Sequence, residues 1–189
     1  MSQSTIHAIS LRHETISLTL VSEVLILSHK DQPSKGKIFR GIWDTGATGS
    51  VITQKIVDQL GLKPTGVAVV QTAGVRDFQT TTYLIDVYLK DGLCIQSINA
   101  SLGSVTDDID CLIGMDIICL GDFSITNFQG KTIMSLRIPS QHDIDFVRQI
   151  NTQNEIILSH QKSGGTMATK CICGSGKKFK NCHGKNLQQ

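Results

Sequence analysis

Short apolar runs alternate with polar turns along most of this chain, and their spacing predicts β-strands rather than long helices. The expected strands cover residues 16–21, 24–27, 38–43, 67–72, 80–90, 95–102, 123–128 and 132–138. Asp91-Gly92 and Gln129-Gly130 each predict a turn between two paired strands. Many short strands with few helices indicate a mainly β fold that closes into a barrel.

Two helices are expected to interrupt this pattern. One is predicted over residues 53–61, where Thr53 is placed to be the N-cap and Gly61 to end the helix. The other, over residues 141–151, carries apolar residues at helical spacing after Pro139, which ends the barrel. We expect its apolar face to pack against the barrel rather than to bind a partner.

The chain has 189 residues, which predicts one domain with an appendage. Its 40% hydrophobic and 18% charged residues are ordinary for a soluble globular protein. The predicted parts are a domain over residues 1–139, a connector helix and linker over 140–165, and a small module over 166–189. The linker expectation rests on the composition of Ser163-Gly164-Gly165-Thr166.

The net charge of +2 is unevenly distributed along the chain. All 16 acidic residues and 12 of the 18 basic ones lie at or before Glu155, which leaves that part with a charge of −4. The remaining basic residues are six lysines, so the tail carries +6. Such segregation predicts two modules with different roles, and the basic one suits an acidic protein partner. We expect no nucleic-acid partner.

The N-terminus has no basic region followed by an apolar run, so we predict no signal peptide. No apolar stretch approaches the ~18 residues that a membrane-spanning helix needs. We therefore expect no membrane span and a cytoplasmic protein. In that compartment Cys94, Cys111 and Cys119, which stand singly in apolar surroundings, are expected to be reduced and buried.

The strongest candidate for chemistry is Asp44-Thr45-Gly46-Ala47, which follows an apolar strand and precedes Ser50-Val51-Ile52. Asp and Gly are common in surface turns, so three residues alone would favour a plain turn. The apolar segments on both sides change that interpretation, because they carry a carboxylate out of a strand onto a tight loop. A second segment, over residues 111–118, has two apolar residues and Gly114 before a short helical run.

Together and in this order, the two segments resemble the signatures of the retropepsin-like aspartic proteases, cellular and bacterial members more than viral ones. The resemblance implies a retropepsin-like closed β barrel with one or two short helices. It also implies that Asp44 is the catalytic carboxylate, that Thr45 locks the loop to its twofold mate, and that Gly46 lets the backbone approach substrate. The second segment would then thread beside the catalytic loop.

Aspartic-protease chemistry needs two carboxylates that share a proton, one acting as base on a water and the other as acid to the carbonyl. The sequence holds one Asp-Thr-Gly and no second Asp-Thr-Gly or Asp-Ser-Gly. The resemblance resolves this, because retropepsins are homodimers in which each subunit donates one Asp. It implies a peptide or protein substrate contacted by Ala47, Thr48 and Gly74 of the flap, with no cofactor for catalysis.

The chain departs from the viral pattern at three positions beside the two segments. Trp43 replaces the smaller aliphatic residue usual before the catalytic Asp, Thr48 stands where viral enzymes have another Asp, and Met115 where they have an Arg. The flap expected over residues 70–77 has a single Gly, whereas viral flaps are Gly-rich. These departures leave cleavage specificity and dimer strength open.

The tail contains a second candidate site, made of Cys171, Cys173, Cys182 and His183. Three thiolates and an imidazole suit tetrahedral zinc, and four protein ligands leave no open position for water, so the site would be structural. With the adjoining Gly-Ser-Gly-Lys-Lys and His-Gly, it resembles the SEC-C motif of the bacterial preprotein-translocase motor ATPase. That resemblance implies docking. The alternative is a flexible basic tail with incidental cysteines.

Two hypotheses of different classes follow from these features. The first is a dimeric aspartic endopeptidase whose zinc-bound basic tail docks it to a partner or substrate. The second is a catalytically idle binding or scaffold protein that keeps the barrel and interacts through its tail. The intact motif at Asp44 favours the enzyme, since a barrel freed from chemistry has no need of an Asp at a dimer axis. Trp43 and the unusual flap favour the scaffold slightly.

Overall fold

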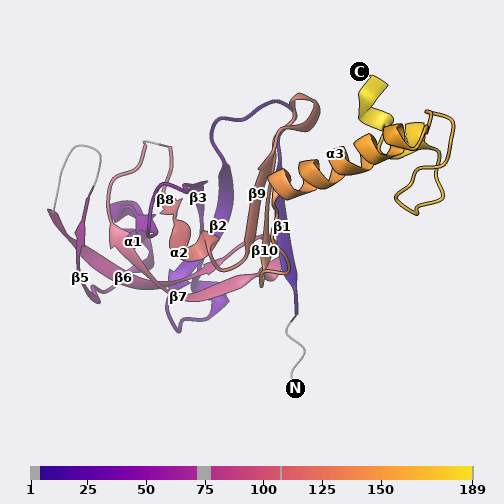
Figure 1. Cartoon of the computed structure of the whole chain (residues 1–189). Coiled ribbons are helices and arrows are strands. Elements are labelled where there is room, and N and C mark those ends of the chain that lie inside the picture. The colour runs from indigo at the N-terminus through magenta and orange to yellow at the C-terminus, as the bar shows by residue number, and fades with distance from the viewer. Residues whose placement is uncertain (1–4, 72–77, 107, 189) are drawn as a thin grey trace. The chain divides into compact units, whose positions relative to one another are not determined.

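The computed structural model describes residues 5–71, 78–106 and 108–188. The chain divides into two compact units, Met1–His142 and Asp143–Gln189. Each unit has its own secondary structure and is described by itself. All the strands of the described residues lie in the first unit (Figure 1).

The first unit has strands throughout its described length. They are β1 (His7–Arg12), β2 (Val21–Ser28), β3 (Lys37–Trp43), β4 (Val51–Ile52), β5 (Gly66–Val70), β6 (Phe78–Tyr88), β7 (Cys94–Leu102), β8 (Cys111–Ile113), β9 (Asp122–Thr126) and β10 (Ile133–Ile138). The hairpin turns predicted at Asp91-Gly92 and Gln129-Gly130 are confirmed, because β6 pairs with β7 and β9 with β10 in antiparallel register.

Six of these strands form a closed barrel, which confirms the predicted fold class. They follow the order β2-β3-β8-β4-β7-β6, and β2 pairs back to β6 through Leu25 and Tyr88. Strand β5 extends the sheet beyond β6. Closure removes the free edges of these six strands, which otherwise would be open to pairing with another chain.

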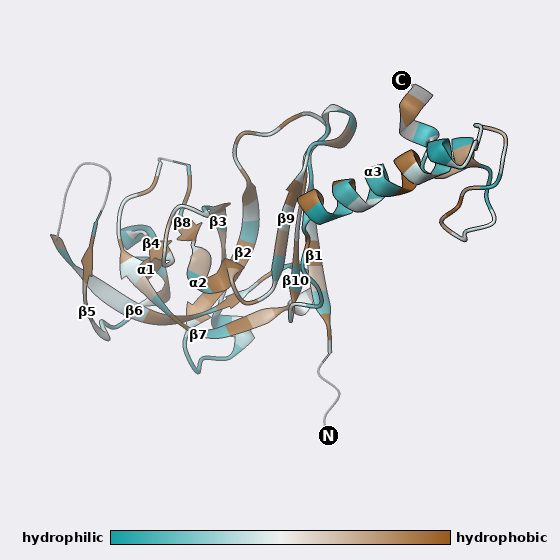
Figure 2. Ribbon diagram, in the orientation of Figure 1, coloured by the Kyte–Doolittle hydropathy of each residue, from teal (hydrophilic) through white to brown (hydrophobic). Residues whose placement is uncertain are grey.

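A second sheet has the order β1-β10-β9, with all strands antiparallel. Its inward residues include Ile9, Met134 and Leu136, which are buried in the same core as the barrel residues. Figure 2 shows hydrophobic residues recurring along the strands of both sheets. The two sheets therefore share one core, as strands with alternate apolar positions require.

Two short helices accompany the barrel, α1 (Gln54–Leu60) and α2 (Met115–Ile118). Thr53 takes the N-cap position of α1 as predicted, although its hydroxyl makes no capping hydrogen bond. Gly61 ends the helix with φ of 59°, a left-handed conformation that favours glycine. The prediction of one or two short helices is confirmed for this unit.

The prediction of a strand over residues 16–21 is wrong for 16–20, since only Val21 is in a strand, the first residue of β2. A strand that was not predicted forms over His7–Arg12. Alternation between polar and apolar residues was present in 16–21, but Leu18 is 96% exposed there. In β1 the alternate residues face the core, and the backbone pairs with β10. A pairing partner, rather than alternation alone, decided which segment became a strand.

Two of the three single cysteines are less buried than predicted. Cys111 is buried, and burial raises the pKa of its thiol to about 12, so it remains a neutral apolar side chain. Cys94 is half-buried. Cys119 is exposed because it lies at the C-terminal end of α2, on the surface of the unit.

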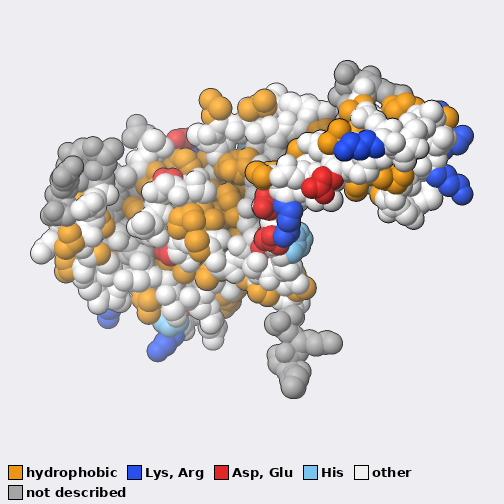
Figure 3. Space-filling view, in the orientation of Figure 1, with side chains coloured by type: hydrophobic (Ala, Val, Ile, Leu, Met, Phe, Trp, Pro, Cys, Tyr) orange, Lys and Arg blue, Asp and Glu red, His pale blue; other side chains and the backbone are white. Residues whose placement is uncertain are grey.

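The second unit begins with α3 (Phe146–Lys162), which extends well past the predicted end at residue 151. Asp145 caps this helix by accepting a hydrogen bond from the Arg148 amide at 3.0 Å. Two short 3₁₀ segments follow, Phe179–Asn181 and Lys185–Gln188. Figure 3 shows hydrophobic side chains on the surface of this unit. Among the hydrophobic residues of α3, Phe146, Val147 and Ile150 are exposed.

The segment predicted as a linker is a hydrogen-bonded turn that closes α3. The Gly165 amide donates to the His160 carbonyl at 2.9 Å, and the Ser163 hydroxyl donates to the same carbonyl at 2.8 Å. A Cβ on Gly165 would lie 2.4 Å from Nε2 of His160, so only glycine fits there. Composition suggested flexibility, but close packing against His160 fixes this turn.

Candidate active site and metal centre

The backbone of Asp44 is positioned by two parallel strands of the barrel. Strand β3 ends at Trp43, which pairs in register with Ile113 at the end of β8. The Asp44 amide then donates to the Ile113 carbonyl at 3.0 Å. Asp44 therefore leaves the sheet where the two strands end, on a turn that both strands support.

The turn itself orients the Asp44 side chain. The Gly46 amide donates to Asp44 Oδ1 at 2.8 Å, and the Ala47 amide donates to the Asp44 carbonyl at 3.4 Å. A Cβ at Gly46 would lie 3.1 Å from Oδ1, which is tighter than an ordinary contact. Glycine at this position thus allows the backbone amide to approach and hold one carboxylate oxygen.

Most of the site residues predicted from the sequence lie together on this turn. Asp44 and Ala47 are half-buried, whereas Thr45, Gly46 and Thr48 are exposed. The turn therefore presents a fixed carboxylate beside exposed residues. The predicted flap residue Gly74 lies outside the described residues.

The segment after β8 lies against the Asp44 turn, as the sequence predicted. The Met115 amide donates to the Ala47 carbonyl at 2.9 Å. A Cβ at Gly114 would come within 2.6 Å of the Gly49 carbonyl, so the two backbones approach as closely as glycine permits. The turn is thereby packed onto the corner between β8 and α2.

Two polar residues at this corner had no role predicted from the sequence, Ser50 and Asp116. Both the amide and the hydroxyl of Ser50 donate to the Asp116 carboxylate, at 2.9 and 2.8 Å. The Ser50 hydroxyl also accepts a hydrogen bond from the Gly114 amide at 3.2 Å. Their signal was a polar residue inside each of the two apolar segments of the predicted signature.

Trp43, which departs from the viral pattern, is buried behind the turn. Its indole Nε1–H donates to the Ser22 hydroxyl at 2.9 Å. Its ring stacks on Phe123 of β9 with centroids 6.0 Å apart and an interplanar angle of 24°. The larger side chain is therefore accommodated by a hydrogen-bond partner and an aromatic neighbour.

A Ser-His-Asp grouping elsewhere in the barrel does not have the geometry of a catalytic triad. His29 Nδ1 lies 2.8 Å from Oδ1 of the buried Asp86. The Ser97 hydroxyl, however, lies 3.4 Å from His29 Nε2 and 3.5 Å from Nδ1. Nearly equal distances place the hydroxyl over the ring rather than along the lone pair of Nε2, so the histidine is not placed to take its proton.

One groove of the first unit does not involve the Asp44 turn. It has a volume of about 590 Å³ and lies between β1 and β2. Its lining includes Ile9, Leu11, Val24 and Ile38. No residue of the turn contributes to it, so this groove is not part of the candidate active site.

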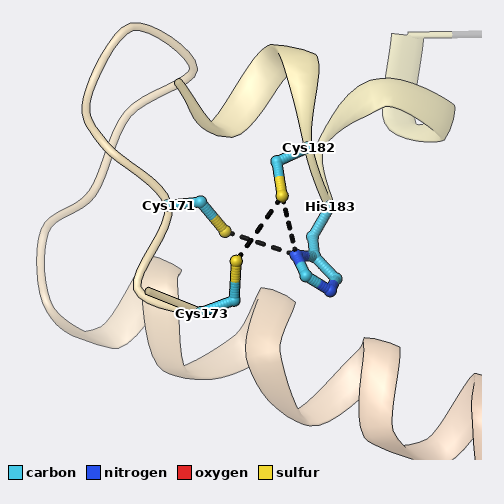
Figure 4. Close-up of side chains that lie close together, drawn as sticks. All are labelled: Cys171, Cys173, Cys182 and His183. Carbon is cyan, nitrogen blue, oxygen red and sulfur yellow. Dashed lines mark hydrogen bonds between the residues drawn. The ribbon is translucent and has the colours of Figure 1, made fainter. Parts of the chain in front are cut away.

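The four predicted metal ligands come together in the second unit (Figure 4). The ligand atoms of Cys171, Cys173, Cys182 and His183 all lie within 4.8 Å of one another. His183 Nδ1 is 3.3 Å from the sulfurs of Cys171 and Cys182, and the Cys173 and Cys182 sulfurs are 3.5 Å apart. Three sulfurs and one nitrogen converging on one point fit a tetrahedral zinc ion.

Residues around the cluster affect the protonation of one cysteine and the path of the backbone. A hydrogen bond with the Ser175 hydroxyl lowers the pKa of Cys173 to about 6, which favours the thiolate that a metal binds. Gly174 and Gly176 have φ of 80° and 71°, and these left-handed conformations return the chain toward the cluster. The cluster is therefore built by local backbone turns.

Helix α3 forms one wall of this small module. The His160 ring is buried and stacks on Phe179, with ring centroids 4.0 Å apart and an interplanar angle of 12°. His160 Nε2 lies 3.1 Å from the Thr166 carbonyl. A Cβ at Gly184 would lie 2.6 Å from the Phe179 ring, so this glycine also packs against the stack. His160 was not predicted from the sequence, because nothing near it along the chain indicates that it contacts an aromatic residue as distant as Phe179.

Comparison with known families supports both resemblances found in the sequence. Residues 34–117 match the family model described as aspartyl protease, and residues 167–185 match the SEC-C motif. The resemblance to retropepsin-like aspartic proteases and to the SEC-C motif is thus confirmed. No curated protein matches the chain.

Solved structures similar to the chain include two proteases. A retropepsin-like aspartic protease from Rickettsia conorii has 16% sequence identity and a TM-score of 0.45, with 73% of this chain and 98% of that chain covered. The EIAV protease in complex with the inhibitor HBY-793 has 19% identity and a TM-score of 0.43, covering 56% of this chain and 91% of its own.

Within the described residues, no helix is long and apolar enough to cross a membrane.

Proposed function

We propose that this protein is an aspartic endopeptidase that acts as a homodimer, with Asp44 from each chain forming the catalytic pair. The observation that carries the proposal is the turn at Asp44. One carboxylate oxygen is fixed by the Gly46 amide at 2.8 Å, and the neighbouring Thr45 and Gly46 are exposed. A half-buried, rigid carboxylate beside exposed residues, on a barrel of this class, suits a site completed by a second copy.

The proposed reaction needs the two Asp44 side chains to share one proton. One carboxylate takes a proton from water, which attacks the peptide carbonyl, while the other gives its proton to the carbonyl oxygen. Two negative charges in contact repel each other, so the pair would hold a single proton between its two carboxylates. Thr45 would hold the two turns together, and Gly46 would allow substrate to approach the backbone.

Substrate recognition is proposed for three residues that follow Asp44 in the sequence. Ala47 and Thr48 lie on the same turn as Asp44, and Gly74 belongs to the segment predicted as a flap. The proposed substrate is a peptide or protein in extended conformation. Because Thr48 and Met115 replace the viral Asp and Arg, we expect cleavage preferences unlike those of viral enzymes.

The second unit is proposed to hold one structural zinc ion through Cys171, Cys173, Cys182 and His183. The bound ion would cross-link the ends of a segment too short to bury a core of its own. Exposed lysines of this unit, among them Lys177, Lys178 and Lys180, would attract an acidic protein partner. A cytoplasmic location is proposed with it, because a reducing compartment keeps the three thiols available for metal.

The decisive experiment is cleavage of a peptide library by wild type and by Asp44→Asn. This substitution keeps the size of the side chain and removes the shared proton, so cleavage should fall by at least about 10³-fold. Asp58→Asn is the matched control, because Asp58 is an exposed aspartate of α1 and should leave activity unchanged. Equal cleavage by Asp44→Asn and wild type would overturn the proposal.

A catalytically idle scaffold is the second candidate function. The buried Trp43 directly before Asp44 favours it slightly, since a smaller aliphatic residue is usual at that position in the family that the sequence resembles. A scaffold would bind its partner through the second unit and cleave no peptide in the library. Binding that survives in Asp44→Asn, together with absence of cleavage by wild type, would select this alternative.

A further inference from the structure

We propose that Asp116 is a positioning residue for Asp44, because its carboxylate fastens the far end of the turn that carries Asp44. This inference rests on the proposed function, since it assigns a role to a second aspartate at that site. Asp116 does not itself reach substrate in this role. It acts through Ser50 and the backbone of the turn.

The Asp116 carboxylate accepts three hydrogen bonds from the residues that the structure describes. Oδ2 accepts from the Ser50 amide at 2.9 Å, and Oδ1 accepts from the Ser50 hydroxyl at 2.8 Å. Oδ1 also accepts from the Ile117 amide at 3.0 Å. Ser50 is 5% exposed, so these charge-assisted bonds are largely shielded from water.

The turn that carries Asp44 is held at both ends by the corner between β8 and α2. Its beginning is fixed by the bond from the Asp44 amide to the Ile113 carbonyl, and its middle by the bond from the Met115 amide to the Ala47 carbonyl. Its end is fixed by Ser50 on Asp116. Without the Asp116 bonds this end would be held at Ser50 by the Gly114 amide on its hydroxyl, at 3.2 Å, and the Ser101 amide on its carbonyl, at 3.0 Å. We expect the end of the turn to be held less firmly by these two bonds.

Among the described residues, the Asp116 carboxylate is occupied by backbone and hydroxyl donors rather than by a basic side chain. Among the ion pairs found in the described part of the chain, none includes Asp116. Asp116 is half-buried, and its acceptors point to the turn and to the first amide groups of α2. Its contacts are therefore those of a brace for the turn, not of a surface charge paired with a lysine or arginine.

The expected effect follows from the demands of catalysis on geometry. A displacement of about 1 Å at a catalytic group costs about 10²-fold in rate. Asp116→Ala should therefore lower kcat by about 100-fold and leave KM within about threefold, because it does not touch substrate. Asp116→Asn keeps one acceptor oxygen for Ser50 and should recover kcat to within about 10-fold of wild type.

The experiment compares wild type, Asp116→Ala, Asp116→Asn and the exposed control Asp58→Ala in three measurements. These are kcat and KM on a peptide that wild type cleaves, melting temperature, and amide hydrogen exchange across residues 44–50. The proposal expects the kcat loss, its rescue by Asn, and faster exchange confined to the turn in Asp116→Ala. A kcat loss without rescue by Asn and with general unfolding would overturn it, as would unchanged kcat.

The exchange measurement separates this inference from the proposed function. If wild type cleaves no peptide, the proposed function fails, and hydrogen exchange alone decides the role of Asp116. Faster exchange of the turn in Asp116→Ala, restored in Asp116→Asn, would then still support the brace. Identical exchange in all variants would overturn it.

Discussion

Trp43 and Phe123 stack with ring centroids 6.0 Å apart, which packs the residue before Asp44 directly onto strand β9. Strand β9 belongs to the second sheet, so this contact joins that sheet to the end of β3. The indole hydrogen bond to Ser22 fixes the ring from the side of β2. The position of the candidate catalytic turn therefore depends on packing between both sheets.

Trp43→Leu should destabilise the first unit by about 2–4 kcal/mol, because it leaves a cavity beside Phe123 and removes the aromatic contact. Ser22→Ala should destabilise the unit less, by about 1–3 kcal/mol. It leaves the buried indole N–H of Trp43 without its hydrogen-bond acceptor but does not change the volume of the core. Urea unfolding of both variants and wild type measures these differences. Equal stability of Trp43→Leu and wild type would contradict the packing role.

Asp122 ties the end of the first unit to the residues after β10. Its carboxylate accepts hydrogen bonds from the Ser140 hydroxyl, the Gln141 amide and the Arg137 guanidinium, and these hold the pKa of Asp122 well below its usual range. A depressed folded-state pKa adds stability above the unfolded pKa of about 3.9, and that stability is lost as pH falls toward the folded pKa.

Asp122→Asn should therefore lower the melting temperature at neutral pH, and the difference from wild type should shrink as pH falls below about 4. Thermal unfolding followed at several pH values measures this effect. Asp31→Asn serves as control, because its pair with Lys35 is exposed and contributes little. A difference that stays constant down to the most acidic pH would refute the linkage.

Zinc content tests the metal centre. Wild type should bind one zinc ion per chain, and Cys182→Ala should bind none with comparable affinity, because three ligands hold zinc far less tightly than four. Removal of zinc by a chelator should unfold residues 166–188 while the barrel keeps its own unfolding transition. Elemental analysis and hydrogen exchange report these two results. Intact wild type free of metal would show the assignment to be wrong.

His160→Ala should loosen the second unit, since it removes the ring that covers Phe179 and leaves a cavity worth about 2–4 kcal/mol. Zinc affinity should fall with it, because a module that folds less readily binds its metal more weakly. Competition with a zinc-binding dye measures the affinity. His142→Ala is the matched control, because that histidine is exposed. Unaltered zinc affinity in His160→Ala would show that helix α3 does not contribute to zinc binding.

The choice of truncation follows from the same contact. A chain ending after His142 removes the whole second unit, whereas one ending at Ser163 would expose His160 by removing Phe179. The shorter chain should keep the barrel and its cleavage of short peptides. Loss of that cleavage in the shorter chain would show that the barrel needs the second unit.

Oligomeric state tests the arrangement proposed for Asp44. Wild type should behave as a dimer at micromolar concentration, and Asp44→Asn should remain dimeric because it keeps the hydrogen-bonding shape of the turn. Bulk at the exposed Thr45, as in Thr45→Arg, should produce monomers and abolish cleavage together. Sedimentation at several concentrations measures this. A wild-type monomer that does not associate with substrate present would contradict the proposal.

Local patterns in the sequence were sufficient for the elements whose signals are local. The turn chemistry at Gly61 and Gly130 was readable because a left-handed backbone favours glycine. The signature around Asp44 and the cluster of cysteines near His183 were readable because their residues lie close together along the chain. The fold class followed from the number and spacing of the strands.

Contacts between distant residues were decided only by the tertiary structure. Ser50 and Asp116 are 66 positions apart, and the stack of His160 on Phe179 joins a helix to a separate turn. Strand β1 formed where β10 offered a partner, and residues 16–20 stayed irregular despite their alternation. The sequence by itself determined which segments could pair or carry chemistry, because propensity and spacing are local. Which of them meet depends on burial and hydrogen bonding across the folded chain, and these have no local signal.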